Sequence, residues 1–213
     1  MPMLALAALA LQVAAMDDPA ERHATCLALI SQDAELAYEE ALAWRHQGGG
    51  WPAEHCVSLS LIALDQPGDG AARLRAAAEG AITATDMSRA IMFGQAGDGF
   101  LRAEAPQEAL AAFQRGLDFA AEDAGLKRGV AEAALALSDA AAAERAAGAA
   151  YAGAATDAAR AKALELRAEA RLALGALDQA RDDVEAARAF APEDIDILLL
   201  RGRINEAIRQ QPG

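Results

Sequence analysis

Small residues recur at a fixed interval in the second half of this 213-residue chain. One series runs Gly97, Ala131, Ala168 and Gly202, with steps of 34, 37 and 34 residues. Two further series keep the same steps, Ala109–Ala143–Ala180 and Gly116–Ala150–Ala187. Steps in the mid-thirties are typical of arrays in which each repeat is a pair of helices. A three-residue insertion explains the longer step, and we place it near Ala158–Arg160, between consecutive repeats.

The composition favours helix. Alanine, leucine, glutamate and arginine dominate, and these side chains lose little rotamer freedom in a helix. Aromatic residues make up only 4% of the chain. We therefore expect an all-α protein with a tight core lined by alanine.

Glycine and proline divide the chain into helix-length pieces. We expect one helix to start at Asp17–Pro19 and to be interrupted at Ser31–Asp33. The run Gly48–Gly50 should end the next helix and permit a new start near Ala53. Further boundaries are expected at Gln66–Gly70, which separates a pair, at Gly80, and at Pro106, which opens a helix to about Ala121.

Residues 90–123 carry the clearest repeat: Phe93, Gly97, Phe100, Ala109, Phe113, Gly116 and Leu117. This order resembles the tetratricopeptide repeat, in which small residues at positions 8, 20 and 27 let helices cross and larger ones at 4, 11 and 24 fill the gaps. The repeat at 161–194 adds Gly175 at the turn and Pro192 at its end. Departures from the pattern are Lys127 and Leu164 at position 4, Arg171 at position 11, and Glu104 in place of the turn glycine.

The resemblance implies a right-handed α-solenoid of antiparallel helix pairs. We expect a leader at 1–15, irregular helical pairs at 16–82, repeats at 83–194 and a capping helix at 195–213, helical from about Ile195 to Arg209. In the irregular part, Ala34, Tyr38, Ala41 and Leu42 have the spacing of a second helix, and Gly70, Leu74 and Ala77 have it more faintly.

Residues 1–15 carry no charged side chain and end in Val13, Ala14 and Ala15, small residues of the kind that signal peptidases accept. The stretch is too short for an ordinary membrane span of about 20 residues. It predicts a cleaved signal peptide and a periplasmic or otherwise exported protein without stable membrane insertion. An uncleaved anchor and a buried first helix are the alternatives.

Cys26 and Cys56 are the two cysteines, and an even number in an exported protein predicts a disulfide. Two free buried thiols are the alternative.

No catalytic or metal-binding pattern is evident in the sequence. The three histidines, His23, His46 and His55, are scattered, and His55 beside Cys56 is best interpreted as a surface histidine next to a disulfide cysteine. Asp182 and Asp183 are interpreted as solvated neighbours on an exposed helix. A net charge of −13 argues against nucleic-acid binding. We expect no cofactor, no metal and no catalytic residue.

In tetratricopeptide proteins the first helix of each pair faces the groove, through positions 2, 5, 9 and 12. By resemblance these positions are Ile91, Gly94, Asp98 and Leu101, then Gly125, Arg128, Glu132 and Leu135, then Lys162, Glu165, Glu169 and Leu172. Asp98, Glu132 and Glu169 share one position, next to a row of three leucines. The implied site is acidic and leucine-lined and suits a basic, amphipathic peptide. The alternative is that the acidic row only reflects the composition.

The leading hypothesis is a periplasmic scaffold or adaptor that binds a protein or peptide. A second hypothesis is a structural part of a cell-envelope assembly that uses the outer faces. A third is an enzyme with a site in the first half, around His23, His46, His55 and Trp51.

Overall fold

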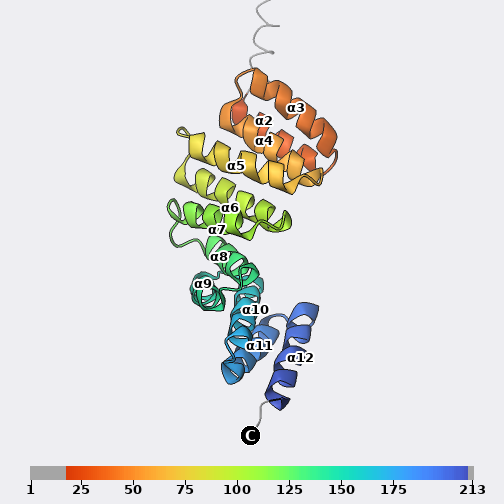
Figure 1. Ribbon diagram of the computed structural model, residues 1–213. Helices are drawn as coiled ribbons and strands as arrows, with labels where there is room; N and C mark the ends of the chain where they lie inside the picture. Colours follow the sequence, from red (N-terminus) through yellow and green to blue (C-terminus); the bar gives the residue numbers. More distant parts are fainter. Residues whose placement is uncertain (1–17, 211–213) are drawn as a thin grey trace, which may run out of the picture. The chain divides into compact units, whose positions relative to one another are not determined.

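The computed structural model describes residues 18–210, which form eleven α-helices and no strand (Figure 1). They divide into two compact units, unit 1 up to Ala84 and unit 2 from Thr85. Unit 1 contains α2 (Pro19–Ile30), α3 (Ala34–His46), α4 (Gly50–Ala63) and α5 (Pro67–Gly80). Unit 2 contains α6 (Asp86–Arg102), α7 (Pro106–Leu117), α8 (Ala124–Ala136), α9 (Ala140–Gly153), α10 (Asp157–Ala173), α11 (Leu177–Phe190) and α12 (Ile195–Arg209).

Short polar residues start most of these helices. A side-chain oxygen of the N-cap residue accepts a first-turn backbone N–H, which otherwise has no partner within the helix. The residues that do so are Asp18, Asp33, Thr85, Asp123, Asp139, Thr156 and Asp194. The predicted starts at Pro19, Pro106 and Ile195 and the break at Ser31–Asp33 are confirmed.

Three predicted boundaries were wrong. α4 starts at Gly50, three residues before Ala53, and α7 ends at Leu117 rather than Ala121. Of the stretch Gln66–Gly70, only Gln66 lies outside a helix, because proline lacks an N–H and is tolerated in a first turn, so α5 begins at Pro67.

The insertion near Ala158–Arg160 was predicted to lie between consecutive repeats, but these residues are helical. It falls inside the first turn of α10, which has 17 residues where α8 has 13. The extra residues therefore lengthen the start of α10, and the loop before it, residues 154–156, is shorter than the loop before α8, residues 118–123.

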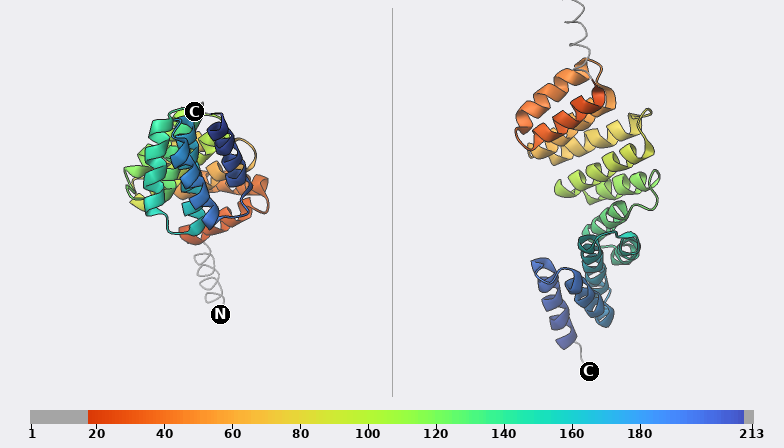
Figure 2. Two further views of the ribbon diagram at one scale, coloured as in Figure 1. Left: turned by 90° about the horizontal axis from the view of Figure 1, so that it is seen from below. Right: turned by 180° about the vertical axis from the view of Figure 1, so that it is seen from behind.

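In unit 2 each helix packs against the next, and α8 also contacts α6 and α10 (Figure 2). The three series of small residues are buried in the unit, with the exception of Gly202. Their buried members are Gly97, Ala131, Ala168, Ala109, Ala143, Ala180, Gly116, Ala150 and Ala187. Gly202 is exposed, because α12 is the last helix of the described chain and nothing lies within 4 Å of the position where its Cβ would be. The repeat register is confirmed, and with it the all-α solenoid of helix pairs within the unit.

Phe113 shows why the residues that face it on α6 and α8, Gly97 and Gly129, must be small. A Cβ at Gly97 would lie 2.5 Å from the Phe113 ring, and one at Gly129 would lie 2.3 Å from it. The ring of α7 thus fills the space between α6 and α8 where both backbones lack side chains. Larger residues at either glycine would displace it.

In the turn within each helix pair, the residue at position 15 has the left-handed backbone conformation, with positive φ. Gly175 has φ +74°, and Ser138 and Glu104 adopt φ 61° and 55° at the same position. Asp65, between α4 and α5, has φ 61° as well. The pair α4–α5 therefore follows the same register, with Ser58 at position 8. Gly70, Leu74 and Ala77 lie on α5 at positions 20, 24 and 27, so the faint second-helix spacing predicted for them is confirmed.

A buried ion network replaces the aromatic residue expected at position 11. Asp183 is only 4% exposed, and its carboxylate accepts hydrogen bonds from Arg167 at 2.6 Å and from Arg171 at 2.7 Å. Arg171 also donates to Glu144 of α9 at 2.8 Å. The interpretation of Asp183 as a solvated residue was wrong, because two guanidinium groups compensate its burial. Asp182 is exposed as expected.

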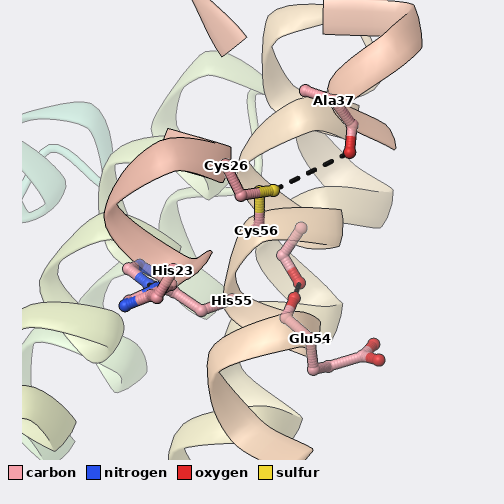
Figure 3. The surroundings of a disulfide bond; sticks show 7 residues. His23, Cys26, Ala37, Glu54, His55 and Cys56 are labelled. Carbon is pink, nitrogen blue, oxygen red and sulfur yellow. Dashed lines mark hydrogen bonds between the residues drawn. A yellow bond between two sulfur atoms is a disulfide. The ribbon is translucent and has the colours of Figure 1, made fainter. Parts of the chain in front are cut away.

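Unit 1 is held by a disulfide between Cys26 of α2 and Cys56 of α4, whose Cα atoms lie 6.3 Å apart (Figure 3). The predicted bridge is confirmed. Ala41, Val57 and Leu61 bury it, with Tyr38 and Leu42 packed against them. The Cys26 sulfur lies 3.8 Å from the Ala37 carbonyl oxygen, and because a disulfide sulfur has no proton to donate, we treat this as a packing contact.

Candidate peptide-binding surface

The predicted groove positions lie on α6, α8 and α10 of unit 2, and several of them line two separate hollows. The first, the α6–α8 hollow, has a volume of about 190 Å³. Its lining is Met87, Ala90, Ile91, Gly94, Gln95, Asp98, Phe113, Asp123, Gly125, Leu126 and Arg128. Five of the predicted groove positions meet here.

The second, the α8–α10 hollow, has a volume of about 290 Å³. Its lining is Leu135, Ser138, Ala140, Glu169, Leu172, Ala173 and Arg203. The predicted residues Leu135, Glu169 and Leu172 meet here. The hollow also includes Arg203 of α12, which occupies the position equivalent to Asp98, Glu132 and Glu169 and was not among the predicted site residues.

The acidic side chains of this surface are not equally available. Glu132 accepts a hydrogen bond from Arg128 at 2.6 Å, and Glu169 accepts one from Arg203 at 3.1 Å. Glu165 is buried and accepts one from Lys162 at 3.0 Å. Asp98 alone of the four forms no hydrogen bond or ion pair within the described residues. The predicted negative row is thus partly neutralised by the protein itself.

The surroundings raise the pKa of two of these carboxyl groups, the exposed Asp98 and the buried Glu165. Loss of water raises the pKa of Asp98, with nearby Arg128 acting in the opposite direction and Glu132 adding to the rise. Burial likewise raises the pKa of Glu165 against the opposing hydrogen bond and charge of Lys162, and the charges of Asp194 and Asp196 add to the rise. Both carboxylates would gain from an additional cation.

The leucine row contributes less open surface than predicted. Leu101, Leu135 and Leu172 are half-buried, and the last two pack against core clusters. More apolar surface is offered by Met87 and Ile91, which are 56% and 49% exposed at the α6–α8 hollow. Met87 was missed because it lies on the extra first turn of α6, before the first position of the repeat.

Two histidines converge in unit 1, so the prediction that they are scattered was wrong. His23 Nε2 lies 2.9 Å from His55 Nδ1, and the two rings lie next to the disulfide (Figure 3). His55 is 5% exposed and is therefore not a surface residue. The His23 ring also makes an edge contact with Trp51, at a centroid distance of 5.7 Å. Sequence distance concealed the pair, because α2 and α4 become neighbours only after α3 has folded back.

The cysteine next to the histidine pair cannot act as a nucleophile. Cys56, next to His55, is bonded to Cys26 and so has no thiolate to activate. Within residues 18–210, no group of three or more His, Cys, Asp or Glu side chains is placed to hold a metal ion. No helix in the same range is long and apolar enough to cross a bilayer. The leader predicted at residues 1–15 lies outside the described residues.

No protein-family model matches the chain, and no curated protein matches it in sequence. Solved structures do match. Nearly identical TPR-like repeats from Podospora anserina align with a TM-score of 0.66 at 15% identity, over 82% of this chain and 96% of that one. A thermophilic tetratricopeptide repeat protein from Thermus thermophilus aligns with a TM-score of 0.56 at 17% identity, over 90% and 98%.

A third match is the first tetratricopeptide domain of Spaghetti (RPAP3), solved bound to the HSP90 peptide SRMEEVD. It has a TM-score of 0.55 at 24% identity, over 59% of this chain and 98% of that one. The register of small residues, the left-handed position 15 and these alignments agree. The chain is therefore a tetratricopeptide-like repeat protein in fold.

Proposed function

We propose that the chain is a non-catalytic scaffold of the periplasm that binds a basic, amphipathic segment of another protein on the first-helix surface of unit 2. The observation that carries the proposal is the convergence of first-helix positions from successive pairs on two hollows. Solved relatives in fold include a domain bound to a peptide, which supports a peptide as the ligand.

The charge of the surface favours a basic partner. The RPAP3 domain was solved with a peptide that ends in the acidic run EEVD. In this chain, Arg128, Lys162 and Arg203 are each bonded to a glutamate, so an acidic peptide would have to compete for them. Asp98 has no such partner, and a basic side chain would meet it without breaking an existing pair.

The periplasmic location is proposed from the apolar leader at 1–15, with the disulfide as support. Structural disulfides persist in oxidising compartments and are rare in the cytosol. Mass spectrometry of the protein purified from its own cells would show a chain beginning at Met16 and carrying one disulfide. A full-length chain with two thiols would contradict the proposal.

The binding proposal is tested by capture from an envelope extract with matched variants. The variant Asp98→Asn, Glu132→Gln and Glu169→Gln removes three acids from the first helices without reversing charge against Arg128 or Arg203. The control Glu108→Gln, Asp178→Asn and Asp182→Asn removes three acids from the second helices α7 and α11. Partners that mass spectrometry identifies with the wild type should be depleted by the first variant only.

Equal depletion by both variants would indicate general charge attraction. Loss with the control alone would favour the outer faces, as in a structural assembly. Crosslinking of a captured partner separates the two directly, because contacts should fall on α6, α8 and α10 if the proposal holds.

A further inference from the structure

The α6–α8 hollow combines a small volume, apolar walls and a carboxylate without an ion partner. Met87, Ile91 and Leu126 supply the walls, with Phe113 deeper in the unit. Gly94 keeps it open, because a Cβ on Gly94 would come within 3.1 Å of Leu126 and so occupy the space between α6 and α8. At about 190 Å³ the hollow has room for a single long side chain rather than a folded segment.

The other charged groups at the hollow are already engaged. Arg128 donates to Glu132, and Asp123 accepts the backbone N–H of Leu126 at 2.8 Å as the N-cap of α8. Asp98 projects from the middle of α6 into the same hollow and makes no such bond within the described residues. The unsatisfied charge of the hollow is therefore negative.

On the basis of the proposed function, we propose that the α6–α8 hollow receives one lysine or arginine side chain of the bound peptide. The aliphatic stem lies against Met87, Ile91 and Leu126, and the cationic end binds the Asp98 carboxylate. Long basic side chains can bury their methylene groups along apolar surface while their charge stays with a polar partner.

Other occupants fit the hollow less well. An acidic side chain would face Asp98 and would have to draw Arg128 away from Glu132. A purely apolar side chain would cover Asp98 without compensating it, and a buried carboxylate without a partner is destabilising. Asp98 is exposed in the free protein, so its carboxylate is open to a cationic partner.

The test begins with a random 12-residue peptide display library selected on the full-length protein. Enriched peptides are synthesised with a fluorophore, and their affinities for wild type, Asp98→Asn and the control Asp182→Asn are measured by anisotropy. Each basic residue of the peptide is replaced in turn by norleucine, which keeps the stem and removes the charge. The melting temperature of each variant shows that the fold is kept.

The expected result is a shared basic residue whose replacement weakens binding about five- to tenfold, with a similar loss in Asp98→Asn and none in Asp182→Asn. When the norleucine peptide is measured on Asp98→Asn, the two losses of affinity should not add, as expected if the basic residue contacts Asp98 directly. Binding should also weaken as the pH falls and Asp98 becomes protonated.

Peptides that bind equally to wild type and Asp98→Asn, or that carry only acidic residues, would overturn the assignment of the hollow and leave peptide binding intact. A selection that enriches no peptide would count against the proposed function as well as against the hollow.

Discussion

Ser58 and Ser60 are both fully buried in α4, and only one of their hydroxyl groups has a partner. Ser58 Oγ donates to the Glu54 carbonyl oxygen at 2.7 Å. Ser60 Oγ has no hydrogen-bond partner. A buried hydroxyl without a partner costs about 1–3 kcal/mol, so the two serines contribute to stability with opposite sign.

Replacement of Ser60 by alanine should therefore stabilise the protein. We expect Ser60→Ala to increase the free energy of unfolding by about 1 kcal/mol, which raises the melting temperature by roughly 2–4 °C in a chain of this size. Ser58→Ala is the matched control and should give no such gain, because it removes a satisfied hydroxyl. A melting temperature lowered by Ser60→Ala, measured by circular dichroism, would show that its hydroxyl is needed.

The histidine pair predicts a loss of stability in acid. Burial, and next to it the charge of His55, lowers the pKa of His23 to about 4 from 6.5. Between these values the unfolded chain binds more protons than the folded one, so stability is complete above pH 6.5 and declines as the pH falls towards 4. Arg22 of α2 adds a further positive charge to this region, since it lies over the Trp44 ring.

The effect of the pair can be isolated by comparison with His23→Gln. Between pH 7 and pH 4, the free energy of unfolding should fall by about 1–2 kcal/mol more in the wild type than in the variant, after allowance for solvent screening. Urea unfolding across this pH range measures the difference. Parallel stability curves for the two proteins would rule out His23 as the titrating group.

At the scale of elements, unit 2 depends on close approach of first helices around a second-helix side chain. Phe113 of α7 lies between Gly97 of α6 and Gly129 of α8. Gly202 occupies the same repeat position on α12 but has no neighbour within 4 Å. The same substitution should thus have opposite effects at the two ends of one series.

We expect Gly97→Ala to destabilise unit 2 by about 1–3 kcal/mol, because the added Cβ would lie 2.5 Å from the Phe113 ring and would force the ring out of its packed position. Gly202→Ala should stabilise it by about 0.5–1 kcal/mol, because alanine is the better helix former and nothing opposes its Cβ. Guanidinium unfolding followed by circular dichroism measures both. Equal effects at the two positions would mean that the ring adjusts freely.

The repeats were predictable from the sequence where packing depends on residue size. Series such as Ala109–Ala143–Ala180 can be recognised in the sequence because only small side chains fit at a helix crossing. Capping residues such as Asp194 indicate helix starts because short polar side chains are preferred there. The histidine pair and the Arg167–Asp183 contact could not be predicted from the sequence, since each depends on which helices become neighbours. Met87 was missed for a third reason: it lies on a turn that the repeat pattern does not contain.

At the scale of the whole molecule, the chain has two units with different sources of stability. Unit 2 relies on small-residue packing and on the ion network around Asp183, whereas unit 1 is covalently closed between Cys26 and Cys56. The 30-residue separation gives a stabilisation of about 3–4 kcal/mol in the chain-entropy model.

The double variant Cys26→Ala and Cys56→Ala should therefore weaken unit 1 and leave unit 2 unchanged. We expect faster amide hydrogen exchange in α2, α3 and α4 and unaltered exchange in α8 to α11, measured by mass spectrometry on peptic fragments. Faster exchange throughout the chain would show that the two units unfold as one.

The disulfide also determines how the chain would respond to a pulling force. Tension applied at the amino end reaches Cys26 and passes through the sulfur atoms directly to Cys56, so the segment between them, with the whole of α3, carries no load. That segment would otherwise release about 100 Å of extended chain. In single-molecule stretching, the oxidised protein should lengthen by that much less than the reduced one, because α3 stays inside the loop that the disulfide closes between α2 and α4.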